Sequence, residues 1–366
     1  MAVIGGGLVG ISLCYELVDR GLDVVLVDRH HEGRATDAGA GILSPETFLD
    51  ADDGWVSLAR AAGEHHSRLS ERVAGDGGEG TGRVVCGLIR ISSSQPEDEW
   101  IDTALALSSR RFPGVVERID PSDALALFPP LAPVRSALYS SAAARIDGRR
   151  AAQAIASAAG ARGLRTVYGE AISLVCDGET VSSIETTDGV VAAGHFAICG
   201  GAWSERFGSQ LRVSLPVTPM KGQIIHMSLP ETDTSGWPIV QPVFSHYLVP
   251  WPDGRVACGG TMETDAGFDT RPTAKGVHEL LRECLKTAPG LQQATIVEVR
   301  VGLRPASSDD RPILGRLPGW SNIHVVTGHG TEGLLLGPYS SALVAESIVS
   351  GTESTALGFL SPARFA

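Results

Sequence analysis

The first ten residues constrain the fold more than any other part of the chain. They read MAVIGGGLVG, so a short apolar run from Ala2 to Ile4 precedes the spacing G-x-G-x-x-G at Gly5, Gly7 and Gly10. The first glycine of this spacing permits a tight turn, the second lets the backbone approach a pyrophosphate, and the third lets a helix pack closely on a strand. A helix that starts here would offer free N–H groups and its positive dipole end to phosphates. The pattern predicts a dinucleotide-binding unit.

Residues 11–28 complete this unit. Apolar residues recur with helical spacing, Gly21 stands where a helix C-cap belongs, and an apolar run from Val24 to Val27 leads to Asp28. Asp28 lies 23 residues after Gly5, where a carboxylate accepts hydrogen bonds from an adenosine ribose. The glycine spacing alone is a weak signal in a chain with 44 glycines among 366 residues. Strand, helix, second strand and acid in this order make dinucleotide binding the favoured interpretation. The helical positions are Ile11, Leu13, Cys14, Tyr15, Leu17 and Val18.

Charge and composition limit the kinds of binding partner and the cellular location that we expect. The chain carries 42 acidic and 30 basic side chains, a net charge of −12, which argues against nucleic acid or an anionic membrane surface as partner. No apolar run has the length of a membrane span, and the amino terminus lacks the basic region of a signal peptide. Six scattered cysteines without a C-x-x-C pattern are typical of reduced, mostly buried thiols. We expect a cytoplasmic protein.

The histidines do not predict a metal site. The pair His30 and His31 follows the ribose acid, and the pair His65 and His66 falls on what reads as a surface helix. Neither pair has the spacing or the neighbouring carboxylates of a familiar metal site. We therefore interpret these four residues as solvated or packing side chains and expect no metal.

The segment after Asp28 favours a flavin nucleotide over a nicotinamide one. Residues 29–45 form a second loop of small residues, and Ala38 to Gly41 leave backbone N–H groups free to approach a planar ring. A typical NAD domain would continue with regular βα units. Two later glycine segments, Phe196–Trp203 and Gly328–Pro338, resemble strand and helix starts of the same architecture. Pro338 is acceptable if it falls in the first turn of the helix that follows, where its missing N–H is not needed.

These segments together resemble the glycine oxidase and D-amino-acid dehydrogenase family of FAD-dependent oxidoreductases, the DAO superfamily. Four motifs carry the resemblance, and they cover both ends and the middle of the chain. They are the N-terminal fingerprint with Asp28 and the loop ATDAGAGILSP, then PVTPMKGQ from Pro216, GLRPASSDDRPILG from Gly302, and TGHGTEGLLLGP from Thr327.

The resemblance implies an α/β fold with two domains. A discontinuous Rossmann-like FAD-binding domain would comprise residues 1–80, 145–215 and 300–366, and an antiparallel-sheet substrate domain would comprise residues 81–144 and 216–299. The second domain would cover the flavin as a roof. Strand-like runs support the roof, and the polar stretch 74–82 reads as a surface loop. These runs are Val84–Ile91, Gln223–Met227, Tyr247–Val249 and Arg255–Gly259.

The motifs and the resemblance also name the residues expected around FAD. His329 among them would lie near the flavin without acting as a base, because hydride transfer from a neutral amine requires no strong base. The expected FAD contacts are Gly5, Gly7, Leu8, Val9, Gly10, Asp28, Arg29, Thr36, Ala40, Gly41, Ile42, Ala171, Gly200, Trp203, Arg304, Gly328, His329, Gly330, Thr331, Glu332, Gly333 and Leu334.

For the reaction, the resemblance implies oxidation of the α-C–N bond of a D-amino acid, glycine or small secondary amino acid to the imino acid, by hydride transfer to flavin N5. Similar proteins place the carboxylate-binding arginine at the position of Arg304, whose planar fork can bind both carboxylate oxygens. Tyr247 is the second candidate, because a phenol on the roof could donate to the same carboxylate. A half-buried strand tyrosine without a catalytic role is the alternative reading of Tyr247.

One motif departs from the glycine oxidases and leaves the substrate open. Glycine oxidases that resemble this chain carry an arginine in the loop after the Gly-His pair, where this chain has Thr331 and Glu332, as D-amino-acid dehydrogenases do. Two alternatives remain: a flavin-bearing subunit of a hetero-oligomeric opine or hydroxyproline dehydrogenase that needs an electron-transfer partner, and a binding protein that retains a nucleotide fold. The sequence leaves open the electron acceptor, the attachment of the flavin, and a homo-oligomeric or hetero-oligomeric state.

Overall fold

The computed structural model describes residues 1–48, 51–77 and 79–366. Its first sheet has six strands in the order β19-β20-β13-β1-β2-β9, all parallel except for the pair β19–β20. β1 and β2 are the two strands expected around the glycine fingerprint. The bounds are β1 (Ala2–Ile4), β2 (Val25–Val27), β9 (Arg165–Val167), β13 (Phe196–Ile198), β19 (Ile313–Arg316) and β20 (Ile323–Thr327).

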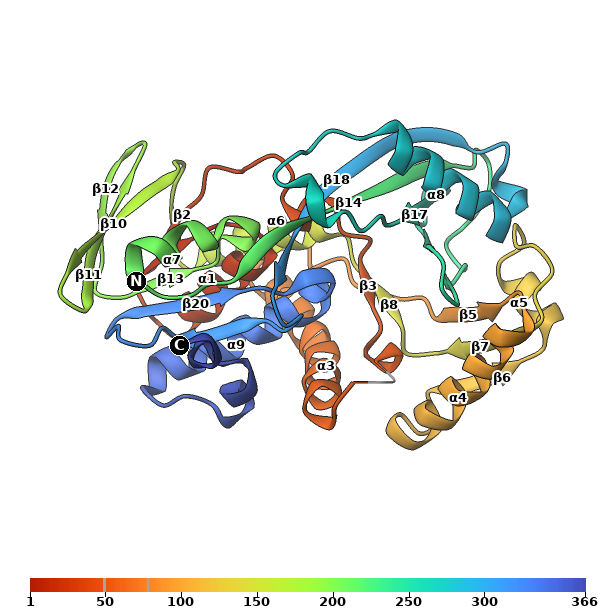
Figure 1. Ribbon diagram of the computed structural model, residues 1–366, viewed down its shortest axis with the longest axis horizontal. Coiled ribbons are helices and arrows are strands. Elements are labelled where there is room, and N and C mark those ends of the chain that lie inside the picture. The colour runs from red at the N-terminus through yellow and green to blue at the C-terminus, as the bar shows by residue number, and fades with distance from the viewer. Residues whose placement is uncertain (49–50, 78) are drawn as a thin grey trace.

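Side chains alternate between the two faces of this sheet, as extended strands require. In β1, Val3 packs into a core built with four helices, whereas Ala2 and Ile4 pack into a second core under a three-stranded sheet and α7. Figure 1 shows this small sheet at one end of the molecule. The helices are α1 (Leu8–Asp19), α3 (Asp53–Gly75), α6 (Gly148–Ala161) and α9 (Gly333–Ser350), and the second layer comprises α7 (Glu205–Leu211), β10 (Ala171–Asp177), β11 (Thr180–Thr186) and β12 (Gly189–Ala192).

The second sheet has eight strands in the order β18-β14-β17-β16-β15-β5-β7-β6 and extends away from the first sheet in Figure 1. Every neighbouring pair is antiparallel except β15 with β5, which is parallel. The expected antiparallel sheet is therefore a mixed one, because more than a hundred residues, rather than a hairpin turn, connect β5 to β15. The bounds are β5 (Leu88–Ser92), β6 (Val116–Ile119), β7 (Ser136–Ser140), β14 (Val217–Ser228), β15 (Ile239–Pro242), β16 (Tyr247–Pro250), β17 (Arg255–Gly259) and β18 (Thr295–Ser307).

Helices α5 and α8 cover the outer face of this sheet, whereas its inner face turns toward the nucleotide unit around β16 and packs against α4 at β5 and β7. Leu280 of α8 packs with Ile89 and Leu248 on the outer face, while Leu88 and Tyr247 pack with Ala40 on the inner face. β18 crosses residue 300, where the sequence analysis placed a domain boundary, so the division into domains stays a proposal. The remaining helices are α2 (Ala35–Ala38), α4 (Gln95–Arg111), α5 (Pro121–Leu127) and α8 (Ala274–Thr287), with 3₁₀ turns η1 (Pro45–Thr47), η2 (Gly201–Trp203), η3 (Thr264–Ala266), η4 (Pro289–Leu291), η5 (Gly330–Glu332), η6 (Thr355–Leu360) and η7 (Pro362–Phe365).

The single strand expected at residues 84–91 is interrupted at Gly87. β4 (Val84–Val85) joins β3 (Ile42–Leu43) and β8 (Ala144–Arg145) in a small sheet, and β5 begins at Leu88 in the large one. Gly87 has φ of +75°, and a Cβ there would lie 2.5 Å from the Tyr139 hydroxyl. This left-handed conformation turns the chain from one sheet into the other.

The expected loop at residues 74–82 starts later than predicted. α3 continues to Gly75, so the first two residues of this stretch are helical, and Thr81 is buried; Gly78 lies outside the described residues. All six cysteines are unpaired, and four of them are buried, as expected. Over the described ranges, no helix combines the length and apolar character needed to cross a membrane.

His65 and His66 are packing residues, one of the two alternatives left open by the sequence, and they lie on the buried face of an amphipathic helix. α3 packs against α9, and the two imidazoles are only 6% and 1% exposed. The apolar stripe that buries this face includes Ala62 and Leu69, one turn before and one turn after the histidines. The packing partner, α9, lies far away in the sequence, so the residues next to the two histidines could not decide between a solvated and a packed position.

Candidate active site

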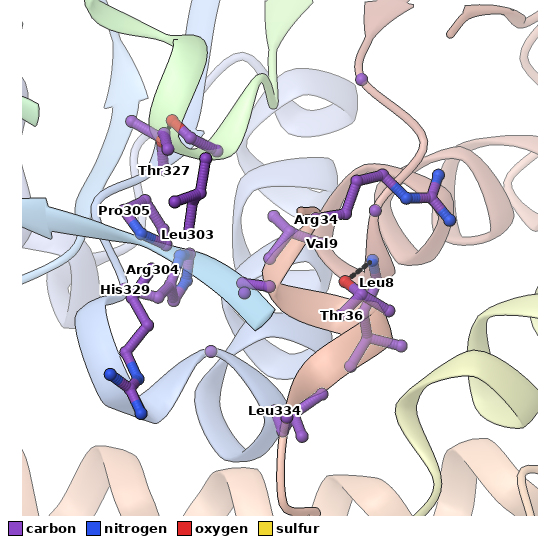
Figure 2. A pocket seen from close by; sticks show the side chains of 18 of the residues that line it. Leu8, Val9, Arg34, Thr36, Leu303, Arg304, Pro305, Thr327, His329 and Leu334 are labelled. Carbon is purple, nitrogen blue, oxygen red and sulfur yellow. Dashed lines mark hydrogen bonds between the residues drawn. The ribbon is translucent and has the colours of Figure 1, made fainter. Parts of the chain in front are cut away.

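In the glycine fingerprint, Gly5 and Gly10 lie at close backbone contacts, whereas Gly7 has free space beside it. A Cβ on Gly10 would lie 1.9 Å from the Gly5 carbonyl oxygen, and a Cβ on Gly5 would lie 2.5 Å from the Cys199 oxygen, so neither residue can carry a side chain. A Cβ on Gly7 would meet only the Thr36 hydroxyl, at 3.3 Å. The Thr36 hydroxyl accepts the Leu8 N–H at 2.9 Å, a contact drawn in Figure 2. The N-terminus of α1, capped by Gly7, is therefore open to an incoming pyrophosphate.

Asp28 is held at the end of β2 by Arg34, a residue that the sequence analysis missed. The Arg34 Nη1 donates to Asp28 Oδ2 at 3.1 Å and to the Gly6 carbonyl at 3.3 Å, and its Nε donates to Asp37 at 3.1 Å. These contacts leave the second Asp28 oxygen to accept a ribose hydroxyl. Arg29, which was expected to contact the cofactor, forms an ion pair with Glu170 at 2.6 Å while it also borders the cavity.

The structure brings nearly all of the expected cofactor residues to one cavity. Of that set, only Gly10 and Gly328 do not line it: Gly10 packs between Gly5 and Cys199, and Gly328 packs against Ile313. Figure 2 shows Leu8, Arg34 and Thr36 on one side of the cavity, opposite Arg304, Pro305 and His329. Residues from both ends of the chain meet here because β1 and β20 flank β13 in the same sheet. This geometry is compatible with the expected contacts, whose roles stay predictions.

The glycine loop before α9 forms the η5 turn, and α9 itself begins at Gly333. Pro338 therefore lies in the second turn of the helix, whereas the sequence predicted it in the first turn. In an α-helix the Leu334 carbonyl would accept the N–H of the residue four positions on, which is Pro338 and has none. The Nε2 of His66 donates instead, at 2.9 Å to the Leu334 oxygen and 3.0 Å to the Leu335 oxygen. Tertiary contact thus replaces the donor that proline removes.

His329 and Glu332 are two titratable groups of this loop. His329 is 3% exposed, its Nε2 contacts no hydrogen-bond partner among the described residues, and burial lowers its pKa to about 4. Its imidazole is therefore neutral at pH 7. Burial raises the pKa of the Glu332 carboxyl, an effect opposed by the hydroxyl of Thr331, which donates to Glu332 at 2.8 Å, and by the charge of Arg304.

Arg304 and Tyr247 meet on the inner face of the eight-stranded sheet. The Arg304 Nη1 donates to the Thr261 carbonyl at 2.8 Å, and no carboxylate of the described residues lies within ion-pair distance of it. A Cβ on Gly260 would lie 2.8 Å from Arg304 Nη2 and 3.1 Å from the Tyr247 hydroxyl, so the missing side chain makes room for both groups. Burial raises the pKa of Tyr247 to about 12, although the charge of Arg304 opposes the shift. Both predicted substrate residues thus face one cavity.

Comparisons with known proteins define the class. The model of the DAO family, FAD-dependent oxidoreductases, matches residues 1–347. An iminodiacetate oxidase from Chelativorans sp. BNC1 superposes with a TM-score of 0.93 at 35% identity, over 99% of this chain and 98% of that chain. The glycine oxidase of Geobacillus kaustophilus gives 0.90 at 28% identity, over 100% and 98%. An uncharacterised oxidoreductase of Bacillus subtilis is 32% identical over 99% of this chain and 98% of its own length.

The chain belongs to the DAO family of FAD-dependent oxidoreductases, and the predicted family, enzyme class and cofactor are confirmed. The residues fit FAD. Gly7 leaves the pyrophosphate position open, Asp28 keeps one free carboxylate oxygen, and the backbone of the η5 turn and the start of α9 borders the same cavity. Gly7 would contact the pyrophosphate, Asp28 the adenosine ribose, and the η5 turn with the start of α9 the flavin end of the cofactor.

Proposed function

We propose that this enzyme oxidises the α-C–N bond of a small amino acid to the imino acid, and that it prefers a secondary amino acid such as an N-substituted glycine. The observation that carries the proposal is the Arg304 guanidinium, which lies beside the Tyr247 hydroxyl, donates to the Thr261 carbonyl, and has no ion-pair partner among the described residues. Such a group in a cavity is suited to an α-carboxylate. Similarity to a protein described as an iminodiacetate oxidase supports a secondary amine.

The chain's own residues orient the substrate. Bound FAD supplies the two-electron acceptor for the hydride that leaves the substrate α-carbon. Arg304 binds both oxygens of the substrate carboxylate through its planar fork and so directs the α-carbon. Tyr247 keeps its proton near neutral pH, because its pKa is raised to about 12, and its hydroxyl donates to the same carboxylate. Neutral His329 adds no positive charge beside the amine, which must arrive unprotonated.

A panel of amines mixed with the FAD-loaded enzyme without oxygen tests the proposal. Sarcosine, iminodiacetate, glycine, D-alanine and D-proline would each be compared with its decarboxylated amine, while the flavin absorbance is followed. We expect bleaching with secondary amino acids and none with the decarboxylated amines, because these lack the group that Arg304 binds. Equal bleaching by acids and amines, or no bleaching by any amino acid, would contradict the proposal.

The electron acceptor separates this proposal from the hetero-oligomeric alternative. An enzyme that works alone should return to its oxidised absorbance when oxygen or an artificial dye is admitted after bleaching. A flavin-bearing subunit that depends on a partner chain should reoxidise slowly in both cases and turn over only when that partner is supplied. Steady-state rates with each acceptor, at equal FAD content, measure the difference.

A further inference from the structure

A row of polar side chains crosses the inner face of the eight-stranded sheet. Gln241 of β15 pairs directly with Arg90 of β5, and the pairing of Val240 with Leu248 places Gln241 opposite Tyr247 of β16. Directly paired residues project from the same face of a sheet. Arg90 therefore points to the face that carries Tyr247, which is also the face of the Arg304 guanidinium.

The packing of the neighbouring residues agrees with this direction. Leu88, two residues before Arg90, packs in the inner cluster with Tyr247, whereas Ile89 and Ile91 pack in the outer cluster under α8. Gln241 lines the same cavity as Tyr247 and Arg304. Arg90 does not itself line that cavity; Gln241 lies between the cavity and this second arginine.

Arg90 is a cation with few partners. Its Nη2 donates to the Gln241 side-chain oxygen at 2.6 Å, and its guanidinium lies 4.7 Å from the centre of the Trp100 ring. Within the described ranges no carboxylate approaches the Arg90 guanidinium to ion-pair distance. A guanidinium has five N–H donors, so one neutral acceptor leaves most of the hydrogen-bonding capacity of Arg90 for other groups.

A buried carboxylate keeps Arg90 charged without pairing with it. Glu46 accepts hydrogen bonds from the hydroxyls of Ser44, at 3.0 Å, and Ser140. Desolvation lowers the pKa of Arg90 to about 10, and the charge of Glu46 opposes that shift. Arg90 therefore remains positive at neutral pH while its remaining donors stay available.

We infer that Arg90 and Gln241 form a second anion-binding subsite, which takes the distal carboxylate of a dicarboxylic N-substituted glycine. This inference rests on the proposed function, in which Arg304 holds the first carboxylate. The Cα atoms of Arg90 and Tyr247 are two strand spacings apart, about 10 Å. The Arg304 guanidinium reaches the neighbourhood of the Tyr247 hydroxyl from β18, so in this inference the diacid spans from the Arg304–Tyr247 pair to Gln241 and Arg90 on the same face of the sheet.

The chemistry of Gln241 fits this role. Its side-chain oxygen accepts from Arg90, which leaves its two amide N–H donors for a ligand. Trp100 stacks on the Arg90 guanidinium and limits its movement. In this inference Gln241 offers its amide donors at the cavity, and the Arg90 guanidinium behind it supplies the positive charge for one carboxylate.

The test compares two non-oxidisable acids with the FAD-loaded enzyme. Oxydiacetate has an ether oxygen in place of the amine of iminodiacetate, and methoxyacetate lacks the second carboxylate. Titration of the flavin absorbance would give the Kd of each acid for wild type, Arg90→Gln, Arg90→Lys and Gln241→Leu, with the exposed Arg68→Gln as the matched control. FAD content and thermal unfolding would be measured for every variant.

We expect wild type and Arg68→Gln to bind oxydiacetate roughly tenfold or more tightly than methoxyacetate. Arg90→Gln should lose that preference and keep its affinity for methoxyacetate, Arg90→Lys should retain part of it, and Gln241→Leu should weaken it. Equal affinity of the two acids for wild type, or an equal loss for both acids in Arg90→Gln, would overturn the inference.

The outcome is distinguishable from failure of the proposed function. If sarcosine bleaches the flavin but oxydiacetate binds no better than methoxyacetate, the enzyme oxidises amino acids and the second subsite is wrong. If no amino acid bleaches the flavin while the diacid preference depends on Arg90, the anion subsite stands and the proposed reaction fails. Should Arg90→Gln fail to retain FAD, the Lys and Gln241→Leu variants still decide the question.

Discussion

One guanidinium carries most of the substrate recognition that we propose. Arg304 has a backbone carbonyl as its partner, and two glycines, Gly222 and Gly260, leave the space that it occupies. The same residue type at Arg34 has a different task, because its contacts to Asp28 and Asp37 hold a ribose-binding carboxylate in place. Arginine chemistry alone therefore does not identify a substrate ligand; the partners within hydrogen-bond distance do.

At this scale we predict that Arg304→Ala lowers kcat/KM for amino acids by roughly two to three orders of magnitude. Loss of one partner from a desolvated charge pair costs about 2–5 kcal/mol, and about 1.4 kcal/mol corresponds to a factor of ten. Arg304→Lys keeps the charge without the bidentate fork and should mainly raise the apparent KM. Steady-state kinetics at matched FAD content measures both. Near-normal turnover of Arg304→Ala, still selective against decarboxylated amines, would shift the anchor to Tyr247.

At the scale of elements, the start of α9 depends on a partner in α3. The imidazole of His66 supplies the donor that Pro338 cannot supply to the Leu334 carbonyl. We expect His66→Leu to lower the free energy of unfolding by about 1–3 kcal/mol, the cost of an unsatisfied buried carbonyl. Pro338→Ala restores the backbone N–H, so the double variant should recover most of the loss. Chemical denaturation of the four proteins tests this; equal losses in the presence and absence of Pro338 would contradict it.

A second prediction at this scale concerns the charge at the N-terminus of α9. Gly333 is the first residue of the helix, and a Cβ there would come no closer than 3.5 Å to the His329 Cβ. Gly333→Asp should lower the flavin reduction potential by about 10–40 mV, because its charge opposes the helix dipole where reduction adds negative charge. Gly333→Asn is the neutral control of similar shape. Potentials unchanged in Gly333→Asp, with FAD bound, would place this helix end away from the flavin.

At the scale of the whole molecule, buried histidines make stability depend on pH. Burial lowers the pKa of several imidazoles to about 4, from an ordinary value near 6.5 in the unfolded chain. Between these values the unfolded chain binds more protons than the folded one, so stability is complete above pH 6.5 and falls as the pH drops toward 4. The imidazoles with a lowered pKa are those of His65, His66, His226, His324 and His329.

The measurement is the thermal midpoint from pH 7.5 to pH 4.5. We expect a decline that begins near pH 6.5, before most carboxylates are protonated. His226→Gln should flatten the decline, because this imidazole is buried with both ring nitrogens unpartnered among the described residues. His30→Gln, at an exposed position, is the control. A midpoint that stays constant down to pH 5 would show that these imidazoles are protonated in the folded protein without cost.

Local chemistry in the sequence determined the nucleotide unit. β1, the turn at Gly5, the start of α1 and Asp28 at the end of β2 all follow from short-range backbone geometry, which adjacent residues dictate. The glycines at positions 5 and 10, where the turn after β1 packs against α1, could be predicted for the same reason, because no Cβ fits there. The family and its cofactor could be predicted from these segments for that reason.

Only the tertiary structure decided how distant residues meet. Arg90, Gln241 and Tyr247 form a row because three strands pair in one register, and the parallel pairing of β5 with β15 has no local signal. His66 and Pro338 are likewise joined across the fold, although each alone is unremarkable in its helix. Strand pairing and helix packing depend on the burial of apolar surface over the whole chain, so such contacts cannot be read from neighbouring residues.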